Sequence, residues 1–261
     1  MAGLRFLIAL VVLAVVFGLV ERRWPASATR RTRWGLDVGW WVLGRVVDPL
    51  VKAVVGLLLV GPLVLAGLPL ERELLLQGHG WLATLPAPLQ LVGALFVADG
   101  CATLLHHLHH RWRPMWRVHA VHHSSTHLDW LAAGRVHPLN EVAQRAPGAL
   151  VLLLLGFDLT VVAAVAPILT LWAVGLHANV DWRLGPLRYV VATPAFHRWH
   201  HAHPPADRPH GCNFAGLFPV FDLILGSYYL PPEPATSFGV VDLDVPERLG
   251  AQLLLRFPPR A

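Results

Sequence analysis

Four long apolar runs dominate the sequence and limit the folds that it can adopt. Three of them cover residues 4–20, 53–70 and 89–105. An apolar helix of about 20 residues crosses the ~30 Å hydrocarbon core of a bilayer, and its backbone satisfies its own hydrogen bonds there. Only 14% of the residues are charged, against roughly 25% in soluble domains. Strand signals are weak, so the sequence predicts an all-α integral membrane protein.

The first run could also be a signal peptide, whose apolar core is followed by small residues at a cleavage site. Here the run is followed by Glu21-Arg22-Arg23-Trp24-Pro25, without such a site. This ending favours a retained transmembrane helix over residues 4–20.

The fourth apolar run, residues 149–176, is too long for a simple span. As one helix it would measure about 42 Å, more than the ~30 Å hydrocarbon core. Breaks are offered by Gly156-Phe157-Asp158 and by Pro167. We therefore expect a helical hairpin that enters and leaves by the same membrane face, which gives about four transmembrane segments in all: two spans, a third span and the hairpin.

The basic residues orient these segments. Residues 22–52 carry seven of them, whereas residues 71–88 carry only Arg72. Positive charge gathers on the cytoplasmic side of membrane proteins. Residues 22–52 are thus expected to form a cytoplasmic loop with interfacial tryptophans, and the third run to end in the cytoplasm. Because the basic residues cluster beside apolar runs, the pI near 10.0 indicates a membrane protein and no nucleic-acid partner.

The rest of the chain suggests one domain over residues 1–261, since no linker, charge block or repeat divides it. The polar, proline-rich chain after Asn179 is expected to complete a cytoplasmic helical cap. Residues 249–257 form a short amphipathic segment suited to the membrane surface. Cys101 and Cys212 form no C-x-x-C pair, and we expect both to be reduced.

Histidine is the feature that points to chemistry, because 14 of the 16 histidines lie between His106 and His203. Residues i, i+3 and i+4 share one face of a helix, so each H-x-x-H-H motif is expected to offer three imidazoles to a metal. Nine ligands exceed the four of a closed zinc site, whereas two metals with four or five imidazoles each would use them all. The nine candidates are His106, His110, His119, His122, His123, His177, His197, His200 and His201.

Ligand type alone leaves the metal open, since imidazole suits iron, zinc, copper and nickel. The sequence lacks the zinc motif H-E-x-x-H, a C-x-x-C pair and the H-x4-D pattern of membrane acyltransferases. A membrane protein that stores or transports metal without redox chemistry is the main alternative, but its ligands would lie near mid-bilayer. A bis-haem electron carrier would need facing histidines within the spans, and the first two runs contain none.

The order H-x3-H, H-x2-H-H, H-x2-H-H resembles the fatty acid hydroxylase/sterol desaturase superfamily of membrane di-iron oxygenases, in its bacterial form. The resemblance is strongest in a histidine-rich core over residues 99–228. The first motif departs from the family, which usually has arginine where His107 stands. The segments that carry the resemblance are Asp99, Trp116 to Ser125, Asp129, Arg135-Val136-His137-Pro138, His177-Ala178-Asn179, Thr193-Pro194, Asn213 to Gly216 and Phe221 to Tyr228.

The resemblance implies two iron ions, O2 as co-substrate and hydroxylation or desaturation of a lipid C–H bond. The lipid would be a fatty acyl, sterol or other isoprenoid-type compound. Electrons would come from a separate ferredoxin- or cytochrome-type donor with its reductase, and an acidic donor could dock on basic side chains. Those side chains are Arg111, Arg113, Arg117 and Arg198.

The resemblance also extends the site beyond the nine histidines. It implies a histidine near the metals at His137, which Pro138 biases toward extended backbone, so we expect a tenth ligand that approaches from a loop. Asp181 or a water molecule is the competing candidate. Groups around the ligands must fix each imidazole ring. The candidates for that role are Asp99, Asp129, Asn179 and Asp222.

Overall fold

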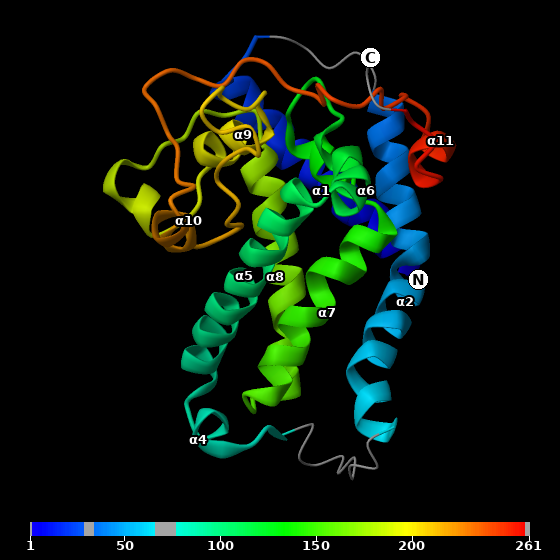
Figure 1. Ribbon diagram of the computed structural model, residues 1–261, viewed down its shortest axis with the longest axis vertical. Helices are drawn as coiled ribbons and strands as arrows, with labels where there is room; N and C mark the ends of the chain where they lie inside the picture. Colours follow the sequence, from blue (N-terminus) through cyan, green and yellow to red (C-terminus); the bar gives the residue numbers. More distant parts are fainter. Residues whose placement is uncertain (1, 29–33, 66–76, 259–261) are drawn as a thin grey trace.

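The computed structural model describes residues 2–28, 34–65 and 77–258. Within these ranges the chain is helical and contains no strand beyond one isolated antiparallel bridge between Ala202 and Phe238. Long helices form the lower body of the molecule, and most of the shorter helices gather at its upper end (Figure 1). The prediction of an all-α membrane fold is therefore confirmed.

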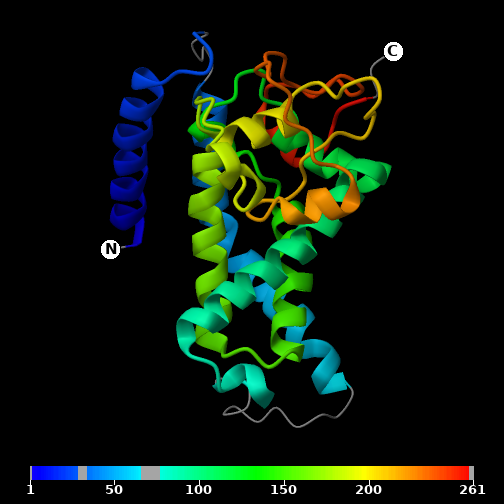
Figure 2. The same cartoon turned by 90° about the vertical axis from the view of Figure 1, so that its left-hand side faces the viewer.

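The long helices stand side by side. Their bounds are α1 Ala2–Arg23, α2 Trp34–Leu65, α5 Ala87–Arg111, α7 Pro138–Leu154 and α8 Leu159–His177. Helices α2, α5, α7 and α8 pack against one another, and α1 lies beside α8 (Figure 2). Phe17 of α1 stacks on Trp130, and Leu10 and Leu13 pack against the same cluster. The outer side chains of α1, such as Leu7 and Ile8, are exposed, as expected for a surface that faces lipid.

Among the residues that the structure describes, three helices are long and apolar enough to cross a membrane by length and composition: Gly3–Arg23, Ala87–Arg111 and Leu159–His177. Helices α5 and α8 both end among the shorter helices, at the same end of the bundle (Figure 1). This arrangement brings His106 and His177 to one end of the molecule, as the hairpin prediction required.

The hairpin exists, but its bounds differ from those predicted. Its first helix, α7, begins at Pro138 rather than Ala149, and Pro167 lies inside α8 without ending it. The break falls at Gly156, whose φ of 88° suits glycine. A Cβ there would lie 2.1 Å from the His79 carbonyl oxygen. Asp158 then caps α8 by accepting a hydrogen bond from the Thr160 amide.

The second span also differs from the prediction. Much of the expected loop over residues 22–52 belongs to α2, which begins at Trp34. Ion pairs with neighbouring residues explain how this helix carries charge. Lys52 pairs with Asp48 at 2.7 Å, and Asp48 also lies 3.8 Å from Arg145 of α7. Residues 29–33 and 66–76, which include Arg72 and the predicted end of the second span, lie outside the described residues.

The upper end of the molecule is a cap of short elements. Their bounds are α6 Arg113–His123, η1 Trp130–Gly134, η2 Gly185–Tyr189, α9 Pro194–His201, α10 Val220–Leu225 and α11 Leu249–Leu253, whereas α4 Gly80–Ala83 lies at the lower end. Pro194 starts α9, and the Thr193 hydroxyl caps it by accepting from the Phe196 amide. Residues 249–257 were expected on the membrane surface, but Phe257 is buried in a core cluster with Trp40.

Candidate metal centre

The nine histidines predicted as ligands lie together in the cap, in two adjacent groups. Within each group the candidate ligand atoms all lie within 4.8 Å of one another. We call them the five-histidine group and the four-histidine group. The five-histidine group is His106, His110, His119, His123 and His200, and the four-histidine group is His122, His177, His197 and His201.

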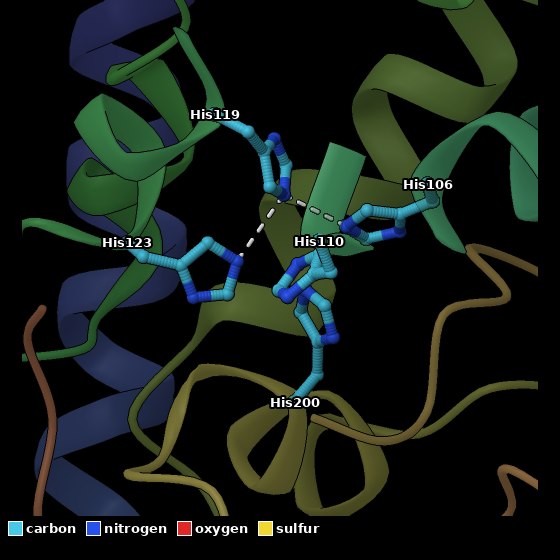
Figure 3. Close-up of side chains that lie close together, drawn as sticks. All are labelled: His106, His110, His119, His123 and His200. Atoms are coloured by element: carbon cyan, nitrogen blue, oxygen red, sulfur yellow. Dashed lines mark hydrogen bonds between the residues drawn. The ribbon is translucent and has the colours of Figure 1, made fainter. Parts of the chain in front are cut away.

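The five-histidine group is assembled by three helices. His106 and His110 come from one face of α5, His119 and His123 from one face of α6, and His200 from α9. Figure 3 shows the five rings converging, with His119 joined to His106 and His123 by dashed lines. The Nε2 atom of His119 lies 2.8 Å from that of His106 and 3.2 Å from that of His123.

The four-histidine group is assembled by α6, α8 and α9. The Nε2 atom of His177 lies 3.2 Å from that of His122 and 3.3 Å from that of His197. The Nε2 atoms of His197 and His201 lie 3.1 Å apart. The two groups are in contact, because the rings of His123 and His201 stack with centroids 4.4 Å apart.

The H-x-x-H-H motifs do not act as predicted. Each was expected to present three imidazoles to one metal, but each divides between the groups. On α6, His119 and His123 join one group and His122 the other; α9 repeats the division in reverse. Helix geometry explains this, since residues i and i+4 lie about 40° apart around the axis whereas i+3 and i+4 lie about 100° apart. Each motif therefore bridges the two groups.

Hydrogen bonds fix the orientation of several rings. A backbone carbonyl oxygen only accepts, so an Nδ1 atom bonded to it carries the proton and leaves Nε2 with a free lone pair. His106 donates to the Phe214 carbonyl at 2.7 Å and His200 to that of Cys212 at 2.9 Å. In the four-histidine group, His122 donates to the Arg135 carbonyl at 3.1 Å and His177 to that of Ala173 at 2.7 Å.

These tautomers make the two groups suitable for cations. The Asn140 side-chain oxygen accepts from Nδ1 of His119 at 3.0 Å, so the close Nε2 atoms of His119 and His106 both carry lone pairs. His122 and His177 face each other in the same way. Such lone pairs repel one another unless a cation lies between them. The donor set therefore fits two metal ions.

Burial supports the same conclusion. It lowers the pKa of His122 to about 3, because desolvation disfavours the charged imidazolium. Burial also lowers the pKa values of His119, His123, His197, His200 and His201 well below the ordinary value. Buried Nε2 atoms of His110 and His200 have no hydrogen-bond partner among the described residues. Neutral imidazoles with free lone pairs are the form that ligates metals.

His137, the expected tenth ligand, belongs to neither group. Its Nδ1 atom accepts from the Leu139 amide at 3.1 Å and caps α7, so Nε2 carries the proton and donates to the Leu253 carbonyl at 3.0 Å. Neither nitrogen is left for a metal in this arrangement. The competing candidate, Asp181, also lies outside both groups and accepts from Arg183 at 3.1 Å.

Asp99 and Asp222 act on the site through the loop of residues 212–218. Asp99 accepts from the amides of Gly216, Leu217 and Phe218, and Asp222 from those of Phe214 and Ala215. The same loop supplies the carbonyl oxygens that orient His106 and His200. Both carboxylates therefore position histidines indirectly, by fixing this loop.

Asp129 and Asn179 hold neighbouring segments. Asp129 caps η1 by accepting from the Leu131 amide and lies 3.5 Å from His127. The Asn179 side chain bonds both the amide and the carbonyl of Ser27. Glu21 accepts from the amides of Trp130 and Asn179, and so ties the end of α1 to these segments.

Sequence reasoning missed two groups that orient ligands. The Asn140 side chain accepts a hydrogen bond from His119. Asn140 comes just after His137 and Pro138 and belongs to no motif of its own. Arg135 was noted only as part of the resemblance. Its side chain forms a buried ion pair with Asp37 of α2 while its carbonyl oxygen accepts from His122. Neither partner is close in sequence, so no local pattern indicates them.

The four arginines expected to form a docking face do not lie together as a free surface. Arg198 is buried, donates to the Leu128 carbonyl and lies over the ring of Phe238. Arg117 donates to the carbonyls of residues 255 and 257. Arg111 and Arg113 are exposed, and they line a cavity of about 320 Å³ that also touches the five-histidine group.

Comparison with known proteins identifies the class to which this fold and site belong. The family model named fatty acid hydroxylase matches residues 91–227, more than half of the 261-residue chain. This range contains all nine histidines of the two groups. The chain belongs to the fatty acid hydroxylase family, as the histidine motifs predicted.

A curated relative is an ornithine lipid hydroxylase, OlsE, from Rhizobium tropici, which is 32% identical over 161 residues. The match covers 62% of this chain and 48% of the relative, so the chain spans about half the length of that protein. No solved structure matches the chain.

Proposed function

We propose that the protein is a membrane di-iron oxygenase that hydroxylates a C–H bond of a lipid. In this reaction one atom of O2 enters the C–H bond as a hydroxyl group and the other leaves as water. An external donor supplies two electrons, and two protons are consumed. The observation that carries the proposal is the pair of adjacent groups in which Nε2 lone pairs face one another. Membership of the fatty acid hydroxylase family supports iron as the metal.

In this proposal the five-histidine group holds one iron ion and the four-histidine group the other. When bound, the two ions supply the redox capacity that activates O2. The protein holds the imidazoles neutral by burial and fixes their rings through Nδ1 hydrogen bonds. The five-histidine group would supply five imidazoles to its ion and the four-histidine group four.

The relative favours hydroxylation over desaturation and suggests the substrate class. Its name describes a hydroxylase that acts on ornithine lipid. We therefore propose a lipid with an amino-acid headgroup as the substrate, in place of the broader fatty acyl or sterol classes. The whole chain, 1–261, would act as one unit, since α2 and the segment after residue 248 contact the metal-binding cap.

Membrane sidedness and the electron donor belong to the same proposal. Arg22 and Arg23 end α1 at the capped end of the bundle, and this positive charge supports a cytoplasmic cap. A ferredoxin- or cytochrome-type donor with its reductase would deliver electrons there. The non-redox metal transporter is disfavoured because both groups come from α6, α9 and the ends of α5 and α8. These segments gather at one end of the bundle and do not line a path through it (Figure 1).

The test uses the full chain purified in detergent. We expect two iron ions per chain, and ¹⁸O from ¹⁸O2 in a lipid product when an artificial or ferredoxin-type reductant is supplied. A chelated, metal-free sample of the same protein is the control. Zinc bound in place of iron, together with no oxygen in any lipid, would support a metal-handling protein instead.

A further inference from the structure

A set of exposed apolar side chains lies on the cap, outside the three helices that are long enough to cross a membrane. These side chains belong to η2, to the residues that flank it, and to α10. Each is at least 44% exposed, and exposed apolar patches mark contact sites with lipid or protein. The two halves meet where the rings of Tyr189 and Tyr228 lie 5.6 Å apart. We call this set the η2–α10 patch, and it consists of Leu184, Leu187, Val190, Leu223, Ile224 and Leu225.

The α10 half of the patch lies beside the part of α5 that precedes the metal-binding histidines. Phe221 of α10 covers Gly100 of α5, where an added Cβ would lie 2.9 Å from the phenylalanine ring. The same ring lies 4.8 Å from that of Phe96, measured between centroids. Asp99 fixes this contact, because it accepts from three amides just ahead of α10. Gly100 comes six residues before His106, which is about 9 Å along a helix. Helix α10 is therefore displaced from the histidines toward the bilayer, beside α5 and below α9 (Figure 1).

The side chains of α5 around this contact are apolar and exposed. Phe96 and Leu104, one helical turn before and after Gly100, are 43% and 61% exposed. All three residues belong to the helix Ala87–Arg111, which is long and apolar enough to cross a membrane. Acyl chains that surround this helix therefore also meet the outward side chains of α10, such as Ile224, which is 75% exposed.

The η2 half of the patch begins beside the end of another apolar helix. Helix α1 ends at Arg23, and the ring of the next residue, Trp24, packs against Trp182 with centroids 5.8 Å apart. Tryptophan side chains gather where membrane-spanning helices reach the headgroups. The patch starts two residues after Trp182, at Leu184. Its η2 half therefore starts at the level at which α1 leaves the bilayer.

Basic side chains paired with tyrosines border the patch. The guanidinium of Arg188 lies 4.9 Å from the ring centroid of Tyr189 and donates to its hydroxyl at 2.9 Å. The guanidinium of Arg208 lies 5.2 Å from the ring centroid of Tyr229 and donates to the Gly226 carbonyl, directly after α10. Long basic side chains and tyrosines favour the boundary between acyl chains and headgroups, where the positive charge can reach lipid phosphates. An apolar centre with such a border is typical of a surface that binds lipid.

We propose that the η2–α10 patch is inserted into the acyl chains of the leaflet at the capped end of the bundle, as a membrane anchor that does not span the bilayer. The proposal concerns the bilayer and does not depend on the proposed reaction. Helix α10 also contains Asp222, which is buried and fixes the loop of residues 212–218. Carbonyl oxygens of that loop orient His106 and His200. The anchor therefore links the bilayer to the five-histidine group.

The first experiment measures the depth of the patch in phosphatidylcholine vesicles that contain the full chain. Ile224→Cys or Leu187→Cys introduces a cysteine for a fluorescent label, and the unsubstituted chain measures labelling of the two natural cysteines. Each label should be quenched several-fold more by nitroxides on lipid acyl chains than by iodide in the water. Thr236→Cys, at an exposed position of the cap outside the patch, is the matched control and should show the reverse.

Two outcomes of this experiment would overturn the proposal. In the first, iodide quenches either patch label as strongly as it quenches the label of Thr236→Cys, which would mean that the patch faces water. In the second, both labels are shielded from iodide but are not quenched by the lipid nitroxides. A second copy of the chain, rather than lipid, would then cover the patch.

The second experiment tests the link to the metal centre. Ile224→Asp places a charge among acyl chains, which is unfavourable, so α10 should move toward the headgroups and loosen the loop of residues 212–218. Iron affinity of the five-histidine group, measured by chelator competition in the same vesicles, should fall roughly tenfold, whereas that of the four-histidine group should stay the same. Thr236→Asp is the control and should keep both affinities. Unchanged iron affinity in Ile224→Asp would overturn the link, and so would an equal loss at both groups.

Discussion

The two histidine groups are neighbours built from the same repeated motif, yet their surroundings differ. Three histidines of the five-histidine group line the 320 Å³ cavity, whereas none of the four-histidine group does. The four-histidine group instead includes His177 at the end of α8, deep among packed helices. One motif, H-x-x-H-H, thus supplies histidines both to a group that borders a cavity and to an enclosed group.

The residues that orient the histidines also differ between the two groups. His106 and His200 of the five-histidine group donate to carbonyls of the 212–218 loop, which Asp99 and Asp222 fix. His122 of the four-histidine group donates to Arg135, whose guanidinium is buried against Asp37 of α2. Because different residues orient the two groups, metal binding by one group can be weakened without affecting the other.

Removal of one ligand from each group should have the largest effect. His122→Ala and His200→Ala should each abolish turnover, because the proposed reaction needs both metals. Each variant should nevertheless keep about one iron per chain, bound by the intact group. Iron analysis with turnover measures both results. The exposed His203→Ala is the control and should keep two irons and most of its activity. Loss of both irons in either variant would show that the groups are one cooperative unit.

Acidification should affect the metal-free protein next most strongly. The folded-state pKa of His122 is about 3, below its ordinary 6.5, so the unfolded chain binds more protons as pH falls. Stability is therefore present above pH 6.5 and is lost as pH falls toward 3. For this histidine alone the loss from pH 8 to pH 5 is ~2 kcal/mol.

Thermal unfolding of metal-free and iron-loaded samples between pH 8 and pH 5 measures this loss. The iron-loaded protein should resist mild acid better, because bound metal competes with protons for the same nitrogen atoms. Equal acid sensitivity of the two samples would contradict metal binding by these histidines.

Substitution of a residue that orients the histidines should weaken iron binding in one group only. Asp37→Asn leaves the Arg135 guanidinium buried without its charged partner, which costs about 3–5 kcal/mol of stability. It should also weaken iron binding in the four-histidine group by about 10–100-fold, as loss of a group that orients a ligand does. Asp48→Asn is the control from the same helix, since its ion pairs are partly exposed and weak.

Asp222→Asn should act on the other group. Asp222 accepts from the Phe214 amide, and the Phe214 carbonyl orients His106. We expect weaker iron binding in the five-histidine group, by roughly tenfold. Chelator competition measures the iron affinity of each variant. His122→Ala and His200→Ala, which each keep the iron of one intact group, are the references that show which group has lost affinity. The same loss of iron affinity at both groups in Asp37→Asn and Asp222→Asn would contradict the expectation that different residues orient the two groups.

Much of the fold could be predicted from local patterns. The apolar runs gave α1 and α5, and Gly156 gave the hairpin break, because hydropathy and backbone freedom are local properties. The start of α2 could not be predicted in this way. Its charged residues looked like part of a loop, because contacts with distant residues, such as that of Asp37 with Arg135, cannot be predicted from a local pattern.

The histidine site, too, could be predicted only where local sequence patterns determine it. Helical spacing selected eight of the nine histidines that the structure brings together, because i, i+3 and i+4 positions follow from a single helix. His177 stands alone in the sequence and was supported by the resemblance of His177-Ala178-Asn179. The division of the nine histidines into two groups could not be predicted, since it depends on how α5, α6, α8 and α9 pack. Asn140 and the carbonyl of Phe214 were missed for the same reason.

His137→Gln should have the smallest effect, and it tests whether the site ends at nine histidines. His137 caps α7 with Nδ1 and links it to α11 through the Leu253 carbonyl. Loss of the cap should cost about 1 kcal/mol, which lowers Tm by roughly 2–4 °C in a chain of this size. Two irons and near-normal turnover should remain, because neither nitrogen of His137 faces a histidine group. Loss of one iron would contradict this expectation. It would mean that His137 leaves both hydrogen-bond partners and binds the metal, which would give the four-histidine group five ligands, as many as the five-histidine group.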